Sequence, residues 1–295
     1  MSYILITPTK SEQELFRLRD TVLSQSMLPL LWVIVDGGDR QSEFATTQGV
    51  FKRDPWVHVI HQQHFADHSY NHRNIALATN EGYRYAKQTC VRQGVEYSYI
   101  GNLDVTPQLP RDFFQILHSE MDSDETLGIV SGVELLLFEG KKIPRKPSIK
   151  LRYSGFTNAR LYRKSFLESI GEDPMPVVPF FEDILLLKAV NRGWNIKSTT
   201  RAQYVEPRLA GSAIGIWRGN KLIGQGMHEL GYHPLLALLH SIDKTLHFPP
   251  HYQIVPMMHG YLQSKIKRVP QVSDPEIRQH FGRDRLHEII AAHVS

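Results

Sequence analysis

The chain has 295 residues, 41% of them apolar, which is enough for one large globular domain or two small ones with a packed core. Its formal net charge is +4, but no recognised nucleic-acid-binding signature accompanies that charge, so we expect no nucleic-acid partner. The single cysteine, Cys90, excludes an internal disulfide framework and a thiolate metal cluster. Because the N-terminus also has no charged-then-apolar leader, we expect a cytoplasmic protein.

The first part of the chain alternates between strand and helix patterns. A buried strand is predicted over Tyr3–Ile6, an amphipathic helix over Glu12–Ser24 and a second strand over Leu31–Val35. Connections of this kind are right-handed crossovers in a parallel sheet. The sequence therefore predicts an α/β fold.

The same pattern continues with a strand over Trp56–His61, a helix over Tyr70–Gln93 and a strand over Tyr97–Leu103. The carboxyl ends of parallel strands open onto the ligand crevice in α/β sheets. The positions to search for chemistry are therefore Thr7, Val35, His61 and Leu103.

The turns after the first two predicted strands indicate which ligands could bind there. Thr7–Glu12 lacks the glycines of a dinucleotide fingerprint, which disfavours a nicotinamide enzyme. The second strand runs into Asp36-Gly37-Gly38-Asp39. Asp36 could accept hydrogen bonds from a base or ribose, or it could serve only the backbone of a tight turn.

Asp104 stands directly after a buried strand, and Pro107 prevents a regular ladder from continuing. Its carboxylate is placed for a metal ion or a sugar hydroxyl. Alternatively, Asp104 or Thr106 starts a turn before the helix predicted over Arg111–Glu120.

A strand predicted over Gly128–Leu137 leads into a basic stretch, Lys141–Lys164, which holds nine Lys or Arg and no acid. That stretch either meets phosphates or an anionic membrane face, or it is a solvated loop.

The pair Glu182-Asp183 stands at the start of an apolar helix, which is followed by a strand at Gly193–Ile196. Acids there complement the helix dipole, but one of them is also suited to act as a general base.

Taken in order, these segments resemble the motif series of family 2 glycosyltransferases over roughly residues 3–205: Thr7–Glu12, Leu31–Asp39, Arg73-Asn74, Leu103–Thr106 and Glu182-Asp183. The resemblance implies an inverting, nucleotide-sugar-dependent enzyme of the GT-A fold, with a mostly parallel central sheet flanked by helices. We expect a catalytic domain at 1–205 and a C-terminal helical extension at 206–295 packed on it.

The resemblance also implies roles for individual residues. The donor nucleotide would contact Pro8, Thr9, Glu12, Asp36, Arg73, Asn74 and Asp104. Asp183 would be the catalytic base, with Glu182 as second choice. UDP is the expected nucleotide, and the acceptor would be a glycan or a lipid-linked molecule.

A divalent cation, Mg²⁺ or Mn²⁺, is implied at Asp104, the first acid of the family's Asp-x-Asp motif. The chain departs from that motif because Thr106 replaces the second acid and Gly37 stands where the family often has another acid. His228 is a candidate third ligand that would help compensate for Thr106. This departure leaves open a non-catalytic nucleotide-sugar-binding protein of the same fold.

The C-terminal extension contains an apolar run, Leu235–Leu239, continued by Ile242 and Leu246 and flanked by His and Lys. A core contact explains this pattern. The alternative is an interfacial helix that brings the enzyme to the inner face of a membrane.

Overall fold

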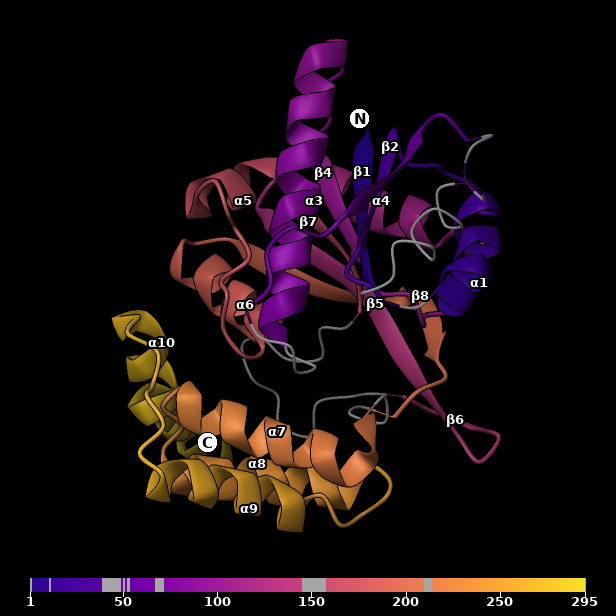
Figure 1. Cartoon of the computed structure of the whole chain (residues 1–295). Helices are drawn as coiled ribbons and strands as arrows, with labels where there is room; N and C mark the ends of the chain where they lie inside the picture. The colour runs from indigo at the N-terminus through magenta and orange to yellow at the C-terminus, as the bar shows by residue number, and fades with distance from the viewer. Residues whose placement is uncertain are drawn as a thin grey trace.

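A computed structural model describes residues 2–10, 12–38, 49, 51, 54–66, 72–144, 158–209 and 214–294. Among these residues, eight strands form one sheet (Figure 1). Its parallel half consists of β3 (Val57–His61), β2 (Leu31–Asp36), β1 (Tyr3–Thr9) and β4 (Tyr99–Leu103), in that spatial order.

The second half of the sheet is mixed. β7 (Ala159–Arg163) pairs antiparallel with both β4 and β5 (Leu127–Phe138). β5 also forms a hairpin with β6 (Lys141–Pro144) and pairs parallel with β8 (Asn195–Glu206). β4, β7, β5 and β8 are therefore consecutive neighbours in this half of the sheet.

Helices cover both faces of the sheet, and strand alternation divides the core between them. In β1, Ile4 and Ile6 face one core, formed with α3 (His72–Gln93) and α6 (Phe181–Asn191). Tyr3 and Leu5 face the other core, which includes residues of α1 (Glu12–Leu23) and α4 (Phe113–Ser123). The short helix α5 (Lys164–Ile170) follows β7 directly.

Pro8 lies inside β1 without interrupting the sheet. β4 pairs with β1 only from Tyr3 to Ile6, so the missing amide hydrogen of Pro8 falls beyond that ladder. The side of β1 that faces β4 is thereby left open at its carboxyl end.

The remaining helices form a layer beyond the carboxyl ends of β1 and β4 (Figure 1). They are α7 (Ile216–Glu229), α8 (Pro234–His247), α9 (Ile254–Ile266), α10 (Pro275–Gln279), the π-helical turn η2 (His280–Asp284) and α11 (Arg285–Val294). None of the helices in the described ranges is long and apolar enough to cross a membrane.

Two glycines let α7 and α9 cross at close range. A Cβ added at Gly224 would lie 1.8 Å from the carbonyl oxygen of Met257, and one at Gly260 would lie 2.0 Å from that of Lys221. The backbones of the two helices are therefore in direct contact.

The structure confirms the predicted fold class, an α/β protein with a central sheet flanked by helices and with C-terminal helices. The strand predicted at Gly193–Ile196 was wrong in extent, because β8 runs from Asn195 to Glu206. Polar residues such as Lys197 and Arg201 alternate with buried ones along it, so no continuous apolar run marks its length.

The basic stretch does not form one surface in the part of the chain that the structure describes, and 145–157 lies outside the described residues. Arg160 is buried. Arg163 donates hydrogen bonds to the backbone oxygens of Leu127, Met121 and Asp124. These two arginines are structural parts of the sheet rather than members of a solvated loop.

Candidate active site

The tips of β1 and β2 lie side by side, with Thr9 opposite Asp36. The Gly37 amide donates to the Thr9 carbonyl at 2.8 Å, and the Gly38 amide donates to Asp36 Oδ1 at 2.8 Å. Asp36 therefore stabilises a turn through one carboxylate oxygen, as the backbone interpretation predicts. Its predicted contact with the donor is not tested by these bonds.

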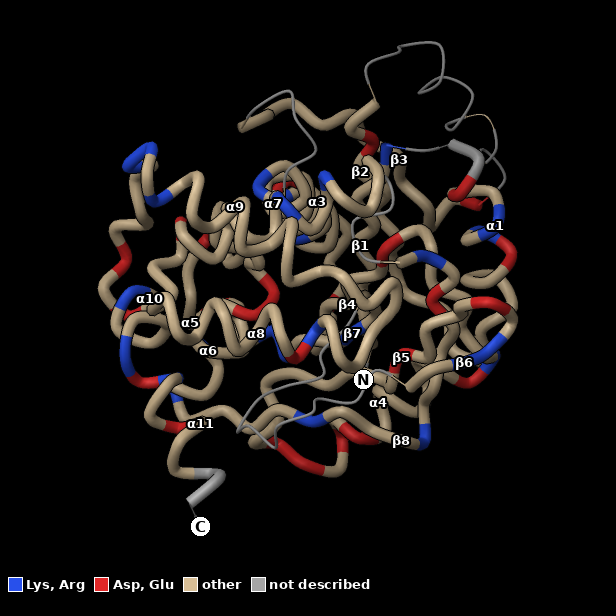
Figure 2. The backbone as a smooth tube through the Cα atoms, turned by 90° about the horizontal axis from the view of Figure 1, so that it is seen from below, with Lys and Arg blue, Asp and Glu red and all other residues tan. Residues whose placement is uncertain are grey.

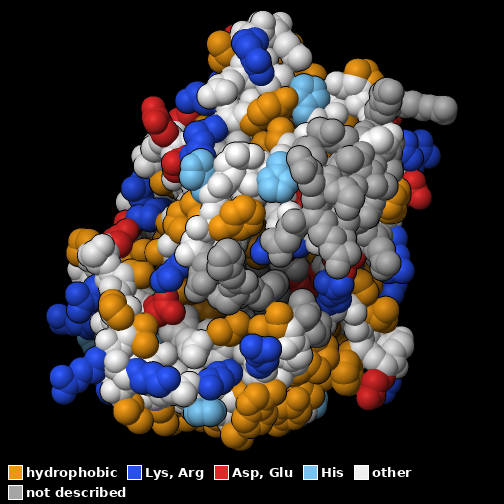
Figure 3. Space-filling view, viewed as in Figure 1, with side chains coloured by type: hydrophobic (Ala, Val, Ile, Leu, Met, Phe, Trp, Pro, Cys, Tyr) orange, Lys and Arg blue, Asp and Glu red, His pale blue; other side chains and the backbone are white. Residues whose placement is uncertain are grey.

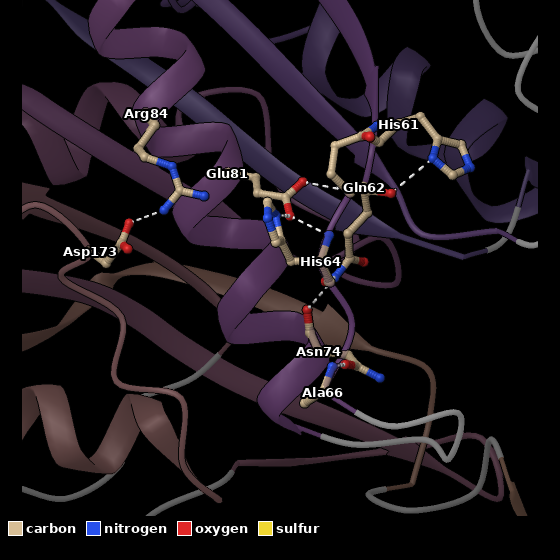
Figure 4. Close-up of polar contacts among 9 residues, drawn as sticks. His61, Gln62, His64, Ala66, Asn74, Glu81, Arg84 and Asp173 are labelled. Carbon is tan, nitrogen blue, oxygen red and sulfur yellow. Dashed lines mark hydrogen bonds and ion pairs between the residues drawn. The ribbon is translucent and has the colours of Figure 1, made fainter.

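The segment that follows β3 is held against α3 beside this turn (Figure 4). Gln62 Nε2 donates to the carbonyls of His64 and Asn74 at 2.7 and 3.1 Å. Asn74 Oδ1 accepts the amide of Ala66 at 2.7 Å. Asn74 thus holds the segment after β3 against α3, and its predicted contact with the donor would come in addition to this structural role.

Glu81 completes the attachment of this segment to α3. Its carboxylate accepts the backbone amides of Gln63 and His64, each at 2.8 Å, and lies 2.8 Å from His64 Nδ1 (Figure 4). One turn further along α3, Arg84 pairs with Asp173. A Cβ at Gly37 would lie 2.6 Å from Gln62 Oε1, so glycine allows the turn to approach this fixed segment.

Arg73, at the start of α3, pairs with Glu229 at the end of α7. The ion pair joins the sheet to the C-terminal layer. Glu12 begins α1, and its side chain lies outside the described residues.

Asp104 stands at the end of β4, where its amide donates to the carbonyl of Asn158 at 3.0 Å. Removal from water, reinforced by the nearby carboxylate of Glu182, raises the pKa of Asp104 to about 7. Neither Asp104 nor Thr106 caps the following helix, because α4 begins at Phe113 with Asp112 as its N-cap residue, and this leaves open that they start a turn before it.

Thr106 contacts a carboxylate that the sequence analysis did not identify. Its hydroxyl donates to Glu206 Oε2 at 2.8 Å, and Asn158 Nδ2 donates to the same oxygen at 3.1 Å. The amide of Arg208 donates to Glu206 Oε1 at 3.0 Å. Burial raises the pKa of Glu206. Its signal in the sequence is an acid at a strand end, which the underestimated length of β8 concealed.

Buried polar atoms without partners lie on β4 and β7, on the sheet face that packs against α6. Arg160 is opposite Asn102 in the ladder, and both side chains are almost completely buried. Among the described residues, Nε and Nη1 of Arg160 and both amide atoms of Asn102 have no hydrogen-bond partner. Buried polar groups are rarely left unpaired in native proteins, so these atoms indicate a place that a ligand or water completes.

The two candidate acids on α6 point differently. Glu182 Oε1 is 3.9 Å from Arg160 Nη2, whereas Asp183 is exposed on the first turn. The N-cap residue, Phe180, has a left-handed conformation with φ 53° and packs against Gly226 of α7. The C-terminal layer therefore supports the start of the helix that carries both acids.

Three carboxylates, those of Glu182, Glu206 and Glu134, lie near enough to Asp104 at the end of β4 to raise its pKa. The guanidinium of Arg160 acts on Asp104 in the opposite direction. An excess of oxygen ligands and negative charge fits a hard divalent ion. Among the described residues, no three His, Cys, Asp or Glu side chains form a complete metal site.

His228 belongs to a different environment. Its Nε2 is 3.0 Å from the carbonyl oxygen of Val269, and its ring packs edge-on against Tyr261. No described contact joins it to Asp104 or Thr106. These contacts give His228 a structural role and lend no support to its predicted role as a metal ligand.

No protein-family model matches the chain, and no curated protein matches its sequence. Its structure is similar to a solved mannosyltransferase, PcManGT from Pyrobaculum calidifontis, in complex with GDP-Man and Mn²⁺. The TM-score is 0.55 at 15% identity over 99% of this chain and 86% of the other.

A second solved structure, residues 1–349 of S. aureus TarS, matches with a TM-score of 0.51 at 12% identity. It covers 99% of this chain and 81% of the TarS chain. At these identities the comparisons establish that the chain has a fold found in glycosyltransferases.

Proposed function

We propose that the chain is an inverting glycosyltransferase of the GT-A type. It would move a sugar from a nucleotide diphosphate sugar, with UDP as the expected nucleotide, to an acceptor hydroxyl. The observation that carries the proposal is the convergence of Asp104, Thr106, Glu206 and Glu182 at the end of β4, in a fold found in glycosyltransferases.

The donor would lie across the strand ends. The tips of β1 and β2, with Pro8, Thr9 and Asp36, would hold the nucleotide beside the fixed segment after β3. Arg73 and Asn74 at the start of α3 would face the diphosphate. The neighbour from Pyrobaculum calidifontis binds GDP-Man with Mn²⁺, which supports a nucleotide-sugar donor and keeps GDP among the nucleotides to test.

We assign the metal ligands to Asp104 and Glu206, the second of which accepts a hydrogen bond from the Thr106 hydroxyl. The bond from Thr106 to Glu206 places a carboxylate next to the position where the motif lacks its second acid. Mg²⁺ or Mn²⁺, when bound, would neutralise the negative charge that develops on the leaving diphosphate. With Glu206 as a ligand, Thr106 would no longer argue for a non-catalytic binding protein.

Asp183 is the proposed general base. Inverting transfer needs a base on the face of the sugar opposite the leaving diphosphate, to take the proton from the acceptor hydroxyl. Asp183 is exposed on the first turn of α6, where an acceptor can reach it. Glu182 is turned toward Arg160, so we assign it to orienting the site.

The test is a panel of UDP-, GDP- and other nucleotide sugars, each with Mn²⁺ and with a chelator, read by thermal shift and by release of the nucleoside diphosphate. We expect one nucleotide class to stabilise the protein in a metal-dependent way, since a ligand at 100 times its dissociation constant adds about 2.7 kcal/mol. NMR of the glycoside product should show an inverted anomeric centre.

Asp183→Asn should lower turnover by about 10²–10⁴-fold while the nucleotide still binds. Binding without release or transfer by the unaltered chain would instead establish the non-catalytic alternative. Unchanged turnover in Asp183→Asn would remove that residue from the base role.

A further inference from the structure

The helices α8 and α9 each leave an apolar stripe uncovered, in addition to the apolar side chains that they bury. On α8, Leu235, Leu238 and Leu246 are exposed, the last to 67% of its surface. Their spacing keeps them on one side, opposite the buried Leu236 and Ala237.

The pattern repeats on α9. Val255, Leu262 and Ile266 are exposed at intervals of seven and four residues, and Ile266 reaches 81%. Met257 and Tyr261 fill the inner side. The two helices contact each other, and the space-filling view shows apolar side chains gathered along this lower edge of the molecule (Figure 3). Contiguous exposed apolar surface of this kind marks an interaction site.

The surroundings of the stripes are basic. Residues 214–270 contain six Lys or Arg and two acids, Glu229 and Asp243. Glu229 is paired with Arg73, and Asp243 lies 3.1 Å from His247 Nδ1. Seen from below, α8 and α9 carry few charged residues along their length (Figure 2).

Cations are concentrated where α9 ends. Lys265, Lys267 and Arg268 are all exposed there, next to Ile266. Arg218, next to Trp217 at the start of α7, is exposed at the other end of this surface. An apolar stripe that ends in cations complements a surface with an apolar interior and anionic groups above it.

Aromatic residues lie at the opposite end of the stripe. Trp217 and Tyr252 stack with ring centroids 6.4 Å apart, and both remain exposed. Trp and Tyr are enriched at membrane–water interfaces, where the ring body meets hydrocarbon and the polar atom meets water.

We propose that the exposed surface of α8 and α9, with its basic and aromatic ends, docks on an anionic lipid bilayer. The contact is peripheral, since no described helix could span the bilayer. The exposed cations Lys265, Lys267 and Arg268 complement anionic headgroups, and this complementarity is the reason for choosing lipid over a second copy of the chain.

Docking would set the orientation of the strand ends relative to the bilayer. The carboxyl ends of β1 and β4 point toward the layer that holds α8 and α9 (Figure 1). The outer side of that layer would rest on lipid, so the strand ends would face the bilayer. The inference itself stands apart from the proposed transfer reaction, because it depends only on the surface of α7, α8 and α9.

The test is flotation of the full chain with vesicles of phosphatidylcholine alone or with about one third phosphatidylglycerol. We expect binding to the anionic vesicles only, and weaker binding at high salt. The double variant Leu262→Glu and Ile266→Glu should lower the partition coefficient at least about tenfold. Because both side chains are exposed, the melting temperature should stay unchanged.

Val91→Glu is the matched control, since Val91 is 76% exposed on α3, away from the proposed surface. It should bind vesicles like the unaltered chain. No binding to anionic vesicles, equal binding to both vesicle types, or equal loss in Val91→Glu would overturn the proposal. A concentration-dependent dimer that the double variant abolishes, without vesicle binding, would assign the surface to a second copy.

Discussion

Thr106 and Glu206 are 100 positions apart in the chain and share a hydrogen bond of 2.8 Å. Thr106 alone suggests a degraded metal motif. The contact changes that interpretation, because the buried carboxylate of Glu206, whose pKa is raised, accepts a hydrogen bond from the Thr106 hydroxyl. The chemistry of a motif position can thus depend on a side chain from a distant strand.

Glu206→Gln should weaken Mn²⁺ binding by at least about tenfold, since it removes an anionic ligand while preserving shape. The measurement is electron paramagnetic resonance of free Mn²⁺ in the presence of the nucleoside diphosphate that binds.

Glu120→Gln is the matched control, because Glu120 is equally buried but bonds Lys197 and Thr199 at the other end of β8. It should destabilise the fold without altering Mn²⁺ affinity. Equal Mn²⁺ affinities of Glu206→Gln and the unaltered chain would exclude Glu206 as a ligand.

His280 should make the fold sensitive to acid. Burial, with Arg285 nearby, lowers the pKa of His280 to about 4. The unfolded chain binds the proton near pH 6.5 and the folded chain does not, so stability is lost as pH falls from about 6.5 toward 4. Through this group alone, the fold should be about 2 kcal/mol less stable at pH 5 than at pH 7.

Urea unfolding of the unaltered chain and of His280→Gln at the two pH values measures this difference. The variant should lose less stability than the unaltered chain on acidification. Parallel losses in the two proteins would mean that His280 is protonated in the folded state.

At the scale of elements, the apolar runs of β1, β2 and β4 were sufficient to predict the parallel half of the sheet, because strands buried on both faces are continuously apolar. β8 was not predictable in the same way, since it is solvated along part of its length. Asp104 could be found because it follows a recognisable strand. Glu206 could not, because its strand was only partly recognised.

The crossing of α7 and α9 depends on glycine. Gly260→Ala would place a methyl group 2.0 Å from the carbonyl oxygen of Lys221. Because that oxygen belongs to the backbone, a change of rotamer cannot relieve the clash. We expect a loss of roughly 1–3 kcal/mol in unfolding free energy, measured by chemical denaturation.

Gly282→Ala serves for comparison, because its Cβ would meet only a carbonyl oxygen at 3.6 Å. That change should be neutral or slightly stabilising, by up to about 1 kcal/mol. Similar effects of the two substitutions would contradict the close helix crossing.

At the scale of the whole molecule, the pair formed by Arg73 and Glu229 connects α3 to α7. Both Arg73→Gln and Glu229→Gln should cost stability, by about 1 kcal/mol for a partly exposed pair. Only Arg73→Gln should also weaken nucleotide binding, if Arg73 contacts the donor. Calorimetric titration of both variants with the nucleoside diphosphate separates the two roles, and equal affinities would restrict Arg73 to joining the layers.

The contact between Phe180 and Gly226 has a consequence for how such chains can be recombined. Phe180 fixes the start of the helix with the proposed base, and a Cβ at Gly226 would lie 2.9 Å from its ring. A chimera that takes its sheet from one parent and its C-terminal helices from another would clash with Phe180 wherever the second parent has a side chain at the position of Gly226. The start of α6 and α7 should therefore come from the same parent. A chimera junction placed after β8 would separate them.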